Sequence, residues 1–274
     1  MAEKSDSTLQ VTGSRPVVPS IPADDYISLD RVRMVYENRC VFDSLTCGFP
    51  RGRVSVVLGG SGSGKSTILR LIGGLVRPQT GAVTVDGQNV GRLSHRGLNL
   101  LRRRLGMVFQ GGALLDSYSV FDNVALPLRE QRRQSESEIA GTVHDILNAV
   151  GVSDADDLLP GELSGGMLRR VALARAIIRK PEVLLCDEPF SGLDPISIRR
   201  MEGLLVQINR EFGMTMIVVS HDIPSTMRMA DHVLLLLGAR VWEGSPAEMR
   251  RSDDAEAAEF FRDGLERLQP QGKS

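Results

Sequence analysis

The sequence predicts an α/β protein built around a mostly parallel sheet, and two observations support that prediction. Residues 53–58 form a strand-length apolar run, a glycine-rich segment follows, and residues 65–75 have helical periodicity. This succession of strand, loop and helix is the βα unit of a parallel sheet. Further apolar runs, several of them rich in Val and Ile, have the length of central strands and are separated by helical stretches. These runs occupy residues 104–109, 182–186, 214–219 and 232–237.

Length and composition limit the possible classes. With 274 residues and 42% hydrophobic content, the chain is long enough to bury a full core. Its 33 basic and 34 acidic residues give a net charge of -1, so the overall charge indicates neither nucleic acid nor an anionic membrane surface as the main partner. Three cysteines without a CxxC pair favour a reducing cytoplasm. We expect a chain that does not itself cross a membrane, because its apolar runs are strand-sized and it begins without a secretory signal.

The pattern divides the chain into three parts. Residues 1–25 contain Gly, Ser and three prolines without hydrophobic periodicity, which predicts a flexible N-terminal segment. Residues 26–250 form the α/β domain, which begins with a strand-like alternation at residues 27–35 and includes a helical insertion at about residues 111–180. Residues 251–274 predict a helical tail with one apolar face, which docks either on its own domain or on a partner chain. The face consists of Ala257, Phe260, Phe261, Leu265 and Leu268.

The segment between the strand at residues 53–58 and the next helix predicts a phosphate-binding loop. It fits the pattern G-x-x-x-x-G-K-[ST] in the strand-to-helix context that this pattern requires. Glycines let the backbone N–H groups surround a phosphate, the helix start contributes positive partial charge, and Lys65 adds a full charge. We expect Ser66 to hold Mg²⁺. The predicted nucleotide-binding residues of this segment are Gly59, Gly60, Ser61, Gly62, Ser63, Gly64, Lys65, Ser66 and Thr67.

Two neighbouring carboxylates, Asp187 and Glu188, end an apolar strand. Successive side chains of a strand point to different sides, so the two carboxylates should do different work. Asp187 suits the Mg²⁺ shell, and Glu188 suits orienting or deprotonating an attacking water. Such a pair on its own is as often only solvated, but the phosphate-binding loop upstream favours the functional interpretation.

A second anion-binding helix start is predicted at Ser164, Gly165 and Gly166, just before a helical stretch. A plain serine N-cap is the alternative for this segment alone. With the phosphate loop and the Asp187-Glu188 strand end, however, it occurs in the order and spacing of ABC ATPases. The chain resembles that family over roughly residues 27–249.

The resemblance implies a fold, an activity and cofactors. It implies an ABC cassette of the P-loop NTPase class, in which a RecA-like core sheet is joined by an antiparallel β subdomain and an inserted helical subdomain. It also implies ATP hydrolysis with Mg²⁺. In this family the nucleotide lies between the phosphate loop of one subunit and the Ser-Gly-Gly helix of a second copy, so that two copies make two sites. ATP then holds the dimer together, and hydrolysis releases it.

The resemblance also implies roles for single residues. Tyr36 resembles the aromatic residue that stacks on adenine, the alternative being an ordinary strand tyrosine. Gln110 resembles the lid glutamine that touches Mg²⁺ and the attacking water. Asp194 matches the loop that reaches across the dimer, and His221 matches the switch histidine that contacts the γ-phosphate. Glu188, His221, Gln110 and Lys65 are thereby implied as catalytic residues, and Ser66, Gln110 and Asp187 as Mg²⁺ ligands.

Within the family, the segment around Met167 is similar to the ATPases of MCE-associated lipid transporters, the Mla and Mkl group. Met167 stands where Gln is commoner, and similar stretches occur at residues 109–117, 120–130, 187–195 and 260–264. This similarity implies phospholipid movement at the cytoplasmic face of a bacterial inner membrane. It implies as partners an MlaE-like permease, an MlaD-like MCE protein and an MlaB-like STAS-domain protein. A polar-solute importer ATPase and a division-type ABC ATPase remain as alternatives.

Overall fold

The computed structural model describes residues 25–37, 39–238 and 240–266. Within them, six strands form a sheet in the order β10-β9-β3-β8-β7-β6. All neighbouring strands from β9 to β6 are parallel, and only β10 at the edge is antiparallel. The predicted mostly parallel α/β sheet is therefore confirmed. Its strands are β3 (Val54–Gly59), β6 (Leu105–Val108), β7 (Val183–Asp187), β8 (Thr215–Val219), β9 (His232–Leu237) and β10 (Arg240–Gly244).

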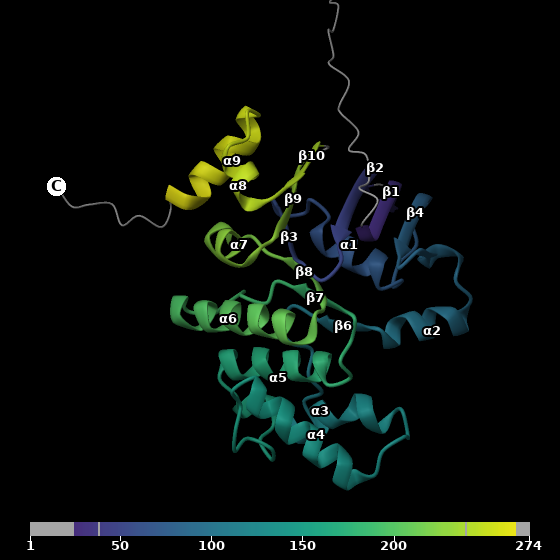
Figure 1. Ribbon diagram of the computed structural model, residues 1–274, viewed down its shortest axis with the longest axis vertical. Helices are drawn as coiled ribbons and strands as arrows, with labels where there is room; N and C mark the ends of the chain where they lie inside the picture. The colour runs from purple at the N-terminus through teal and green to yellow at the C-terminus, as the bar shows by residue number, and fades with distance from the viewer. Residues whose placement is uncertain (1–24, 38, 239, 267–274) are drawn as a thin grey trace, which may run out of the picture.

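A smaller antiparallel sheet in the order β2-β1-β4-β5 lies beside the first one (Figure 1). Helix α1 (Lys65–Ile72) contributes Ile68 and Leu69 to a core cluster that also holds Ile27 from β1 and Val57 from β3. This helix starts at the predicted residue but ends three residues before the predicted end. The strands of the smaller sheet are β1 (Asp25–Tyr36), β2 (Arg39–Pro50), β4 (Thr80–Val85) and β5 (Gln88–Asn89).

Between β6 and β7 the described chain is helical and extends away from the two sheets (Figure 1). The apolar faces of these helices contribute Val124, Val143 and Val171 to the larger core cluster, which also covers one face of the parallel sheet. Serine N-caps begin the first two helices, and Ser135 forms a full capping box with Glu138. The helices are α3 (Val120–Arg129), α4 (Glu136–Ala149) and α5 (Gly165–Ile177), with a 3₁₀ turn at Pro160–Glu162.

The remaining helical elements complete the domain: 3₁₀ turn η1 (Val90–Arg92), α2 (His95–Arg103), α6 (Pro195–Phe212), α7 (Ile223–Met229), α8 (Pro246–Arg250) and α9 (Ala255–Glu266). Ala257 and Phe261 of α9 are buried in the larger core cluster, and Phe260 packs against it. The described part of the apolar tail face thus docks on its own domain. The side chain of Leu265, residue Leu268 and the predicted flexible segment before Asp25 lie outside the described residues. Among the helices that are described, none is long and apolar enough to span a bilayer.

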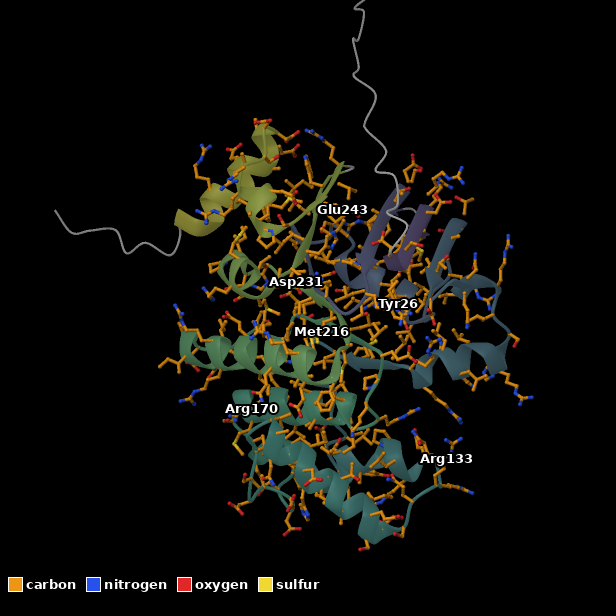
Figure 2. All side chains as sticks on the ribbon, in the orientation of Figure 1. Tyr26, Arg133, Arg170, Met216, Asp231 and Glu243 are labelled. Atoms are coloured by element: carbon orange, nitrogen blue, oxygen red, sulfur yellow. The ribbon has the colours of Figure 1, made fainter. Side chains whose placement is uncertain are left out.

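A polar network joins the two sheets at Tyr26, which Figure 2 labels. The Tyr26 hydroxyl donates to Glu182 at 2.5 Å, and Arg104 donates to the Tyr26 oxygen, to Glu182 and to Asp86. The Arg104 guanidinium lowers the pKa of Glu182 to about 2, against the opposing effect of burial. Burial, followed by the hydrogen bond to Glu182, raises the pKa of Tyr26 to about 12. These contacts hold β1 and the end of β4 against the parallel sheet.

Candidate functional site

A hollow of about 550 Å³ lies at the carboxyl end of the parallel strands, where α/β proteins bind ligands. It brings together most of the predicted site residues of the first half of the chain with Glu188 and His221 from the second half. Its walls are Tyr36, Arg39, Val41, Gly59, Ser61, Gly62, Gly64, Lys65, Ser66, Thr67, Gln110, Glu188 and His221. A larger hollow of about 720 Å³ on α6 and α7 contains none of the predicted site residues.

The loop from β3 to α1 depends on glycine for its path. Gly64, the residue before α1, has φ 98°, and a Cβ there would lie 2.4 Å from Cζ of Phe42. Any other residue would suffer both backbone strain and this clash. Within the described residues, no side chain caps the start of α1, and the buried Oγ of Ser63 has no hydrogen-bond partner. The loop therefore offers unpaired donors, which suits an anionic phosphate group.

Lys65 lies inside this loop and is about half buried. Its ammonium donates to the carbonyl oxygens of Gly59 and Gly60, each at 2.9 Å. Burial lowers its pKa, although the charges of Glu188 and Asp187 oppose that shift. The ammonium is thus held over the loop by two neutral carbonyl oxygens. A phosphate oxygen could replace them as its hydrogen-bond acceptor.

The two carboxylates at the end of β7 have different partners, as the alternation of strand side chains predicts. Asp187 is buried and accepts a hydrogen bond from the Ser66 hydroxyl at 2.8 Å. Glu188 lies 2.8 Å from Nδ1 of His221, measured from its Oε2. An ionised carboxylate only accepts hydrogen bonds, so Nδ1 of His221 is the donor in this pair. Asp187 and Ser66 form one polar pair and Glu188 and His221 form the other.

Glu188 has an unusual backbone conformation. Its φ of 49° is in the left-handed region, which non-glycine residues rarely occupy and which costs about 1–3 kcal/mol. Its N–H extends the strand hydrogen bonding by donating to the Val219 carbonyl at 3.0 Å, and its own carbonyl accepts from the Ser191 N–H in the turn that follows. The neighbouring strand and the following turn thereby hold the carboxylate toward the hollow.

Residues outside the obvious motifs also reach the hollow. Gln110 follows β6, and Tyr36 ends β1 with about a third of its surface exposed. Arg39 was not predicted. It is the cross-strand partner of Tyr36, and its Nη2 donates to the Gly62 carbonyl at 2.9 Å. A basic residue soon after the aromatic one was the only signal for it in the sequence.

The Ser-Gly-Gly helix start does not line the hollow. Ser164 caps α5 by accepting from the Met167 N–H at 3.3 Å, and both Ser164 and Gly165 are exposed. Asp194 is also outside the hollow and caps α6, accepting from the backbone of Ile196 and Ser197. A Cβ on Gly166 would lie 3.7 Å from the Ser197 hydroxyl, so the starts of α5 and α6 are adjacent. In the single chain, the Ser-Gly-Gly helix start and the loop from β3 to α1 are therefore separate features.

A glycine-lined lysine loop, a paired acidic strand end and a second, lysine-free helix start together define an ATP-binding cassette. The model of the ABC transporter family matches residues 42–191, which is more than half of the chain, and the chain belongs to this family. The ABC cassette fold and the assignment as an ATPase are thereby confirmed.

Two curated relatives illustrate the similarity. The intermembrane phospholipid transport system ATP-binding protein MlaF of Escherichia coli K12 is 43% identical over 229 residues, which cover 83% of this chain and 85% of that protein. The probable ribonucleotide transport ATP-binding protein mkl of Mycobacterium leprae is 37% identical over 234 residues, covering 85% of this chain and 67% of that protein.

Solved structures show the same fold. The cbiO1 subunit from Clostridium perfringens is 30% identical with a TM-score of 0.77, and the match covers 89% of this chain and 96% of that one. The ATP-binding cassette MJ0796, in a dimeric post-hydrolysis state with ADP and Pi, is 30% identical with a TM-score of 0.74. That match covers 80% of this chain and 98% of the other.

Proposed function

We propose that two copies of this chain form the ATP-hydrolysing part of an inner-membrane complex that moves phospholipid between the inner and outer membranes. The observation that carries the proposal is the 43% identity with MlaF across 85% of that protein's length. The chain would sit on the cytoplasmic face, bound to an MlaE-like permease, with an MlaD-like MCE protein and an MlaB-like STAS-domain protein in the same assembly.

Within one chain, the hollow would hold ATP with its phosphates on the loop. Tyr36 would stack on adenine, the N–H groups from Gly59 to Thr67 would surround the β-phosphate, and Lys65 would reach the β- and γ-phosphates. The buried, unpartnered hydroxyl of Ser63 supports this placement, because a bound phosphate would supply the partner that it lacks.

The oxygen ligands Ser66, Asp187 and Gln110 fit Mg²⁺, which prefers carboxylate, hydroxyl and amide oxygens. The 2.8 Å contact between Ser66 and Asp187 already brings two of the three together. When bound, the ion would neutralise negative charge on the β- and γ-phosphates.

Glu188 and His221 suit the hydrolytic step. Glu188 would orient the attacking water and accept its proton, and His221 would hold the carboxylate and contact the γ-phosphate from its exposed side. The 2.8 Å hydrogen bond between them and the constrained backbone of Glu188 support these roles. Water attack at phosphorus would release phosphate and leave ADP.

The position of Ser164, Gly165, Gly166 and Asp194 outside the hollow supports a shared site. A second copy facing the first would place its Ser-Gly-Gly helix start and its Asp194 over the nucleotide of its partner. Closure of such a dimer depends on ATP, since a ligand shifts conformations only through differential affinity. That closure would drive the permease.

The relatives divide on substrate, because mkl is named for probable ribonucleotide transport. The higher identity and the greater coverage of MlaF favour phospholipid. Affinity purification of the tagged chain from detergent-solubilised membranes, followed by mass spectrometry of proteins and lipids, tests the proposal. We expect a polytopic permease, an MCE protein and bound phospholipid. A complex with a periplasmic solute-binding protein and no phospholipid would contradict it.

A further inference from the structure

The charge of this chain is distributed unevenly, although its net charge is only -1. From residue 44 to residue 115, the sequence holds ten arginines and lysines but a single acidic residue, Asp86. Asp86 is already engaged by both Arg51 and Arg104. This part of the molecule therefore carries a local positive surplus that the overall balance conceals.

Five of these ten basic side chains form ion pairs or hydrogen bonds within the domain, and five form no ion pair among the described residues. The first five are Arg51, Arg53, Lys65, Arg102 and Arg104, which bind carboxylates or backbone carbonyls. The other five are exposed, and no carboxylate among the described residues forms an ion pair with them. They are Arg70, Arg77, Arg92, Arg96 and Arg103.

Two of the five lie on one side of α2. Arg96 and Arg103 are seven residues apart, with exposed Leu100 between them. Residues at these intervals share one helix face. We call Arg96, Leu100 and Arg103 the α2 basic face. Figure 1 shows α2 on the outside of the molecule beyond β4.

The opposite side of α2 packs on the end of α1. Leu101 is buried there, and Arg102 donates to the carbonyls of Gly73 and Gly74 at 3.2 and 2.9 Å. On the basic face itself, Leu100 is 54% exposed. A large apolar side chain thus reaches solvent between Arg96 and Arg103.

A further cation crowds the same region. Arg179 donates to the backbone carbonyl of Arg103, and its Nε is buried without a hydrogen-bond partner among the described residues. Burial first, and then the charge of Arg103, lowers its pKa, while Glu130 opposes the shift. The positive charges here are therefore close enough to repel one another, and an external anion would relieve the repulsion.

We infer that the α2 basic face binds an anionic phospholipid bilayer surface. The arginines would contact lipid phosphates, and Leu100 would enter the headgroup boundary, as in interfacial helices. Nucleic acid is a poorer occupant, because no aromatic side chain belongs to this face to stack on bases. An acidic protein segment could form ion pairs with the arginines, but ion pairing does not account for the exposed leucine between them. The inference rests on this charge pattern and not on the proposed substrate.

Flotation of the purified full-length chain with unilamellar vesicles tests the inference. Vesicles of phosphatidylcholine alone are compared with vesicles that also contain phosphatidylglycerol. We expect binding only to the anionic vesicles, with loss of binding as the salt concentration rises. The double variant Arg96→Gln/Arg103→Gln should bind about 30-fold more weakly, since each basic side chain near such a surface contributes about fivefold. Arg250→Gln/Arg251→Gln removes the same charge from two exposed positions at the end of α8 and should bind like the unchanged chain.

Nucleotide binding by each variant shows that it is folded. Equal flotation of the double variant and the unchanged chain would overturn the inference, as would equal binding to neutral vesicles. If no vesicle binding occurs but the double variant loses the permease during purification, the face contacts an acidic protein segment and the inference is wrong. Vesicle binding together with a phospholipid-free native complex would instead contradict the proposed function and leave this inference standing.

Discussion

Glu243 on β10 allows a quantitative test of how the two sheets fit together. Its carboxylate accepts a hydrogen bond from the Gly48 N–H of β2 at 3.0 Å, and it is labelled in Figure 2. Burial raises its pKa from 4.5 to about 7; the Gly48 hydrogen bond opposes this shift and Asp25 adds to it. The folded protein therefore favours the protonated acid.

The pH dependence follows from this direction. A pKa raised in the folded state means that the stability contribution is complete below pH 4.5 and is lost as the pH rises to about 7. A difference of 2.5 pH units corresponds to about 3 kcal/mol of unfolding free energy. Glu243→Gln keeps the shape and the acceptor for Gly48 but cannot ionise. We expect it to match the unchanged protein near pH 4 and to be more stable by about 3 kcal/mol at pH 8.

Urea unfolding at a series of pH values measures this difference, with fluorescence of Trp242, the only tryptophan, as the signal. Both proteins carry the same other titratable groups. The difference between their unfolding free energies at each pH therefore reports on Glu243 alone. A stability difference between the two proteins that stays constant from pH 5 to pH 8 would refute the assignment of a raised pKa to Glu243.

Three further predictions concern the site and its supports. Lys65→Ala should weaken ATP binding by about 1.5–3 kcal/mol without unfolding the chain, because it removes a charge-assisted contact to phosphate; unchanged affinity in calorimetry would contradict this. Gly64→Ala should abolish ATP binding, because its φ of 98° strains the new residue and the added Cβ clashes with Phe42. Gly141→Ala in α4, where an added Cβ would meet no atom within 4 Å, should bind ATP normally and gain up to about 1 kcal/mol of stability. Arg104→Ala should cost about 1–2 kcal/mol of unfolding free energy at pH 7, as judged by urea unfolding, because it removes the cation that pairs with Glu182 and Asp86 at the partly exposed sheet junction; unchanged stability would show that the network is dispensable.

Much of the core could be predicted from the sequence, because parallel strands buried on both faces leave continuous apolar runs. The strands that contain Val56, Leu185 and Val218 were all found in this way. The smaller sheet was harder, since β2 has polar interruptions and bulges, and its presence came from family resemblance. Short amphipathic α2 was missed for a related reason: only Leu98 and Leu101 of its nine residues anchor it.

The site was predicted where a motif is contiguous and was missed where tertiary contacts create it. Lys65 and Asp187 belong to local patterns that demand their chemistry. Arg39 reaches the hollow only because β1 and β2 pair as a hairpin, and nothing in its neighbourhood requires an arginine. Likewise, Tyr26 and Glu182 are 156 residues apart in sequence, so no local pattern links them.

The central claim is that two copies close around ATP and that Glu188 is required to reopen them. It is tested most directly by measuring ATP turnover and the molar mass of Glu188→Gln in solution with ATP and Mg²⁺. We expect a stable dimer with ATP, a monomer without it, and turnover lower by orders of magnitude than in the unchanged chain. Normal turnover, or a variant that remains monomeric with saturating ATP, would contradict the account.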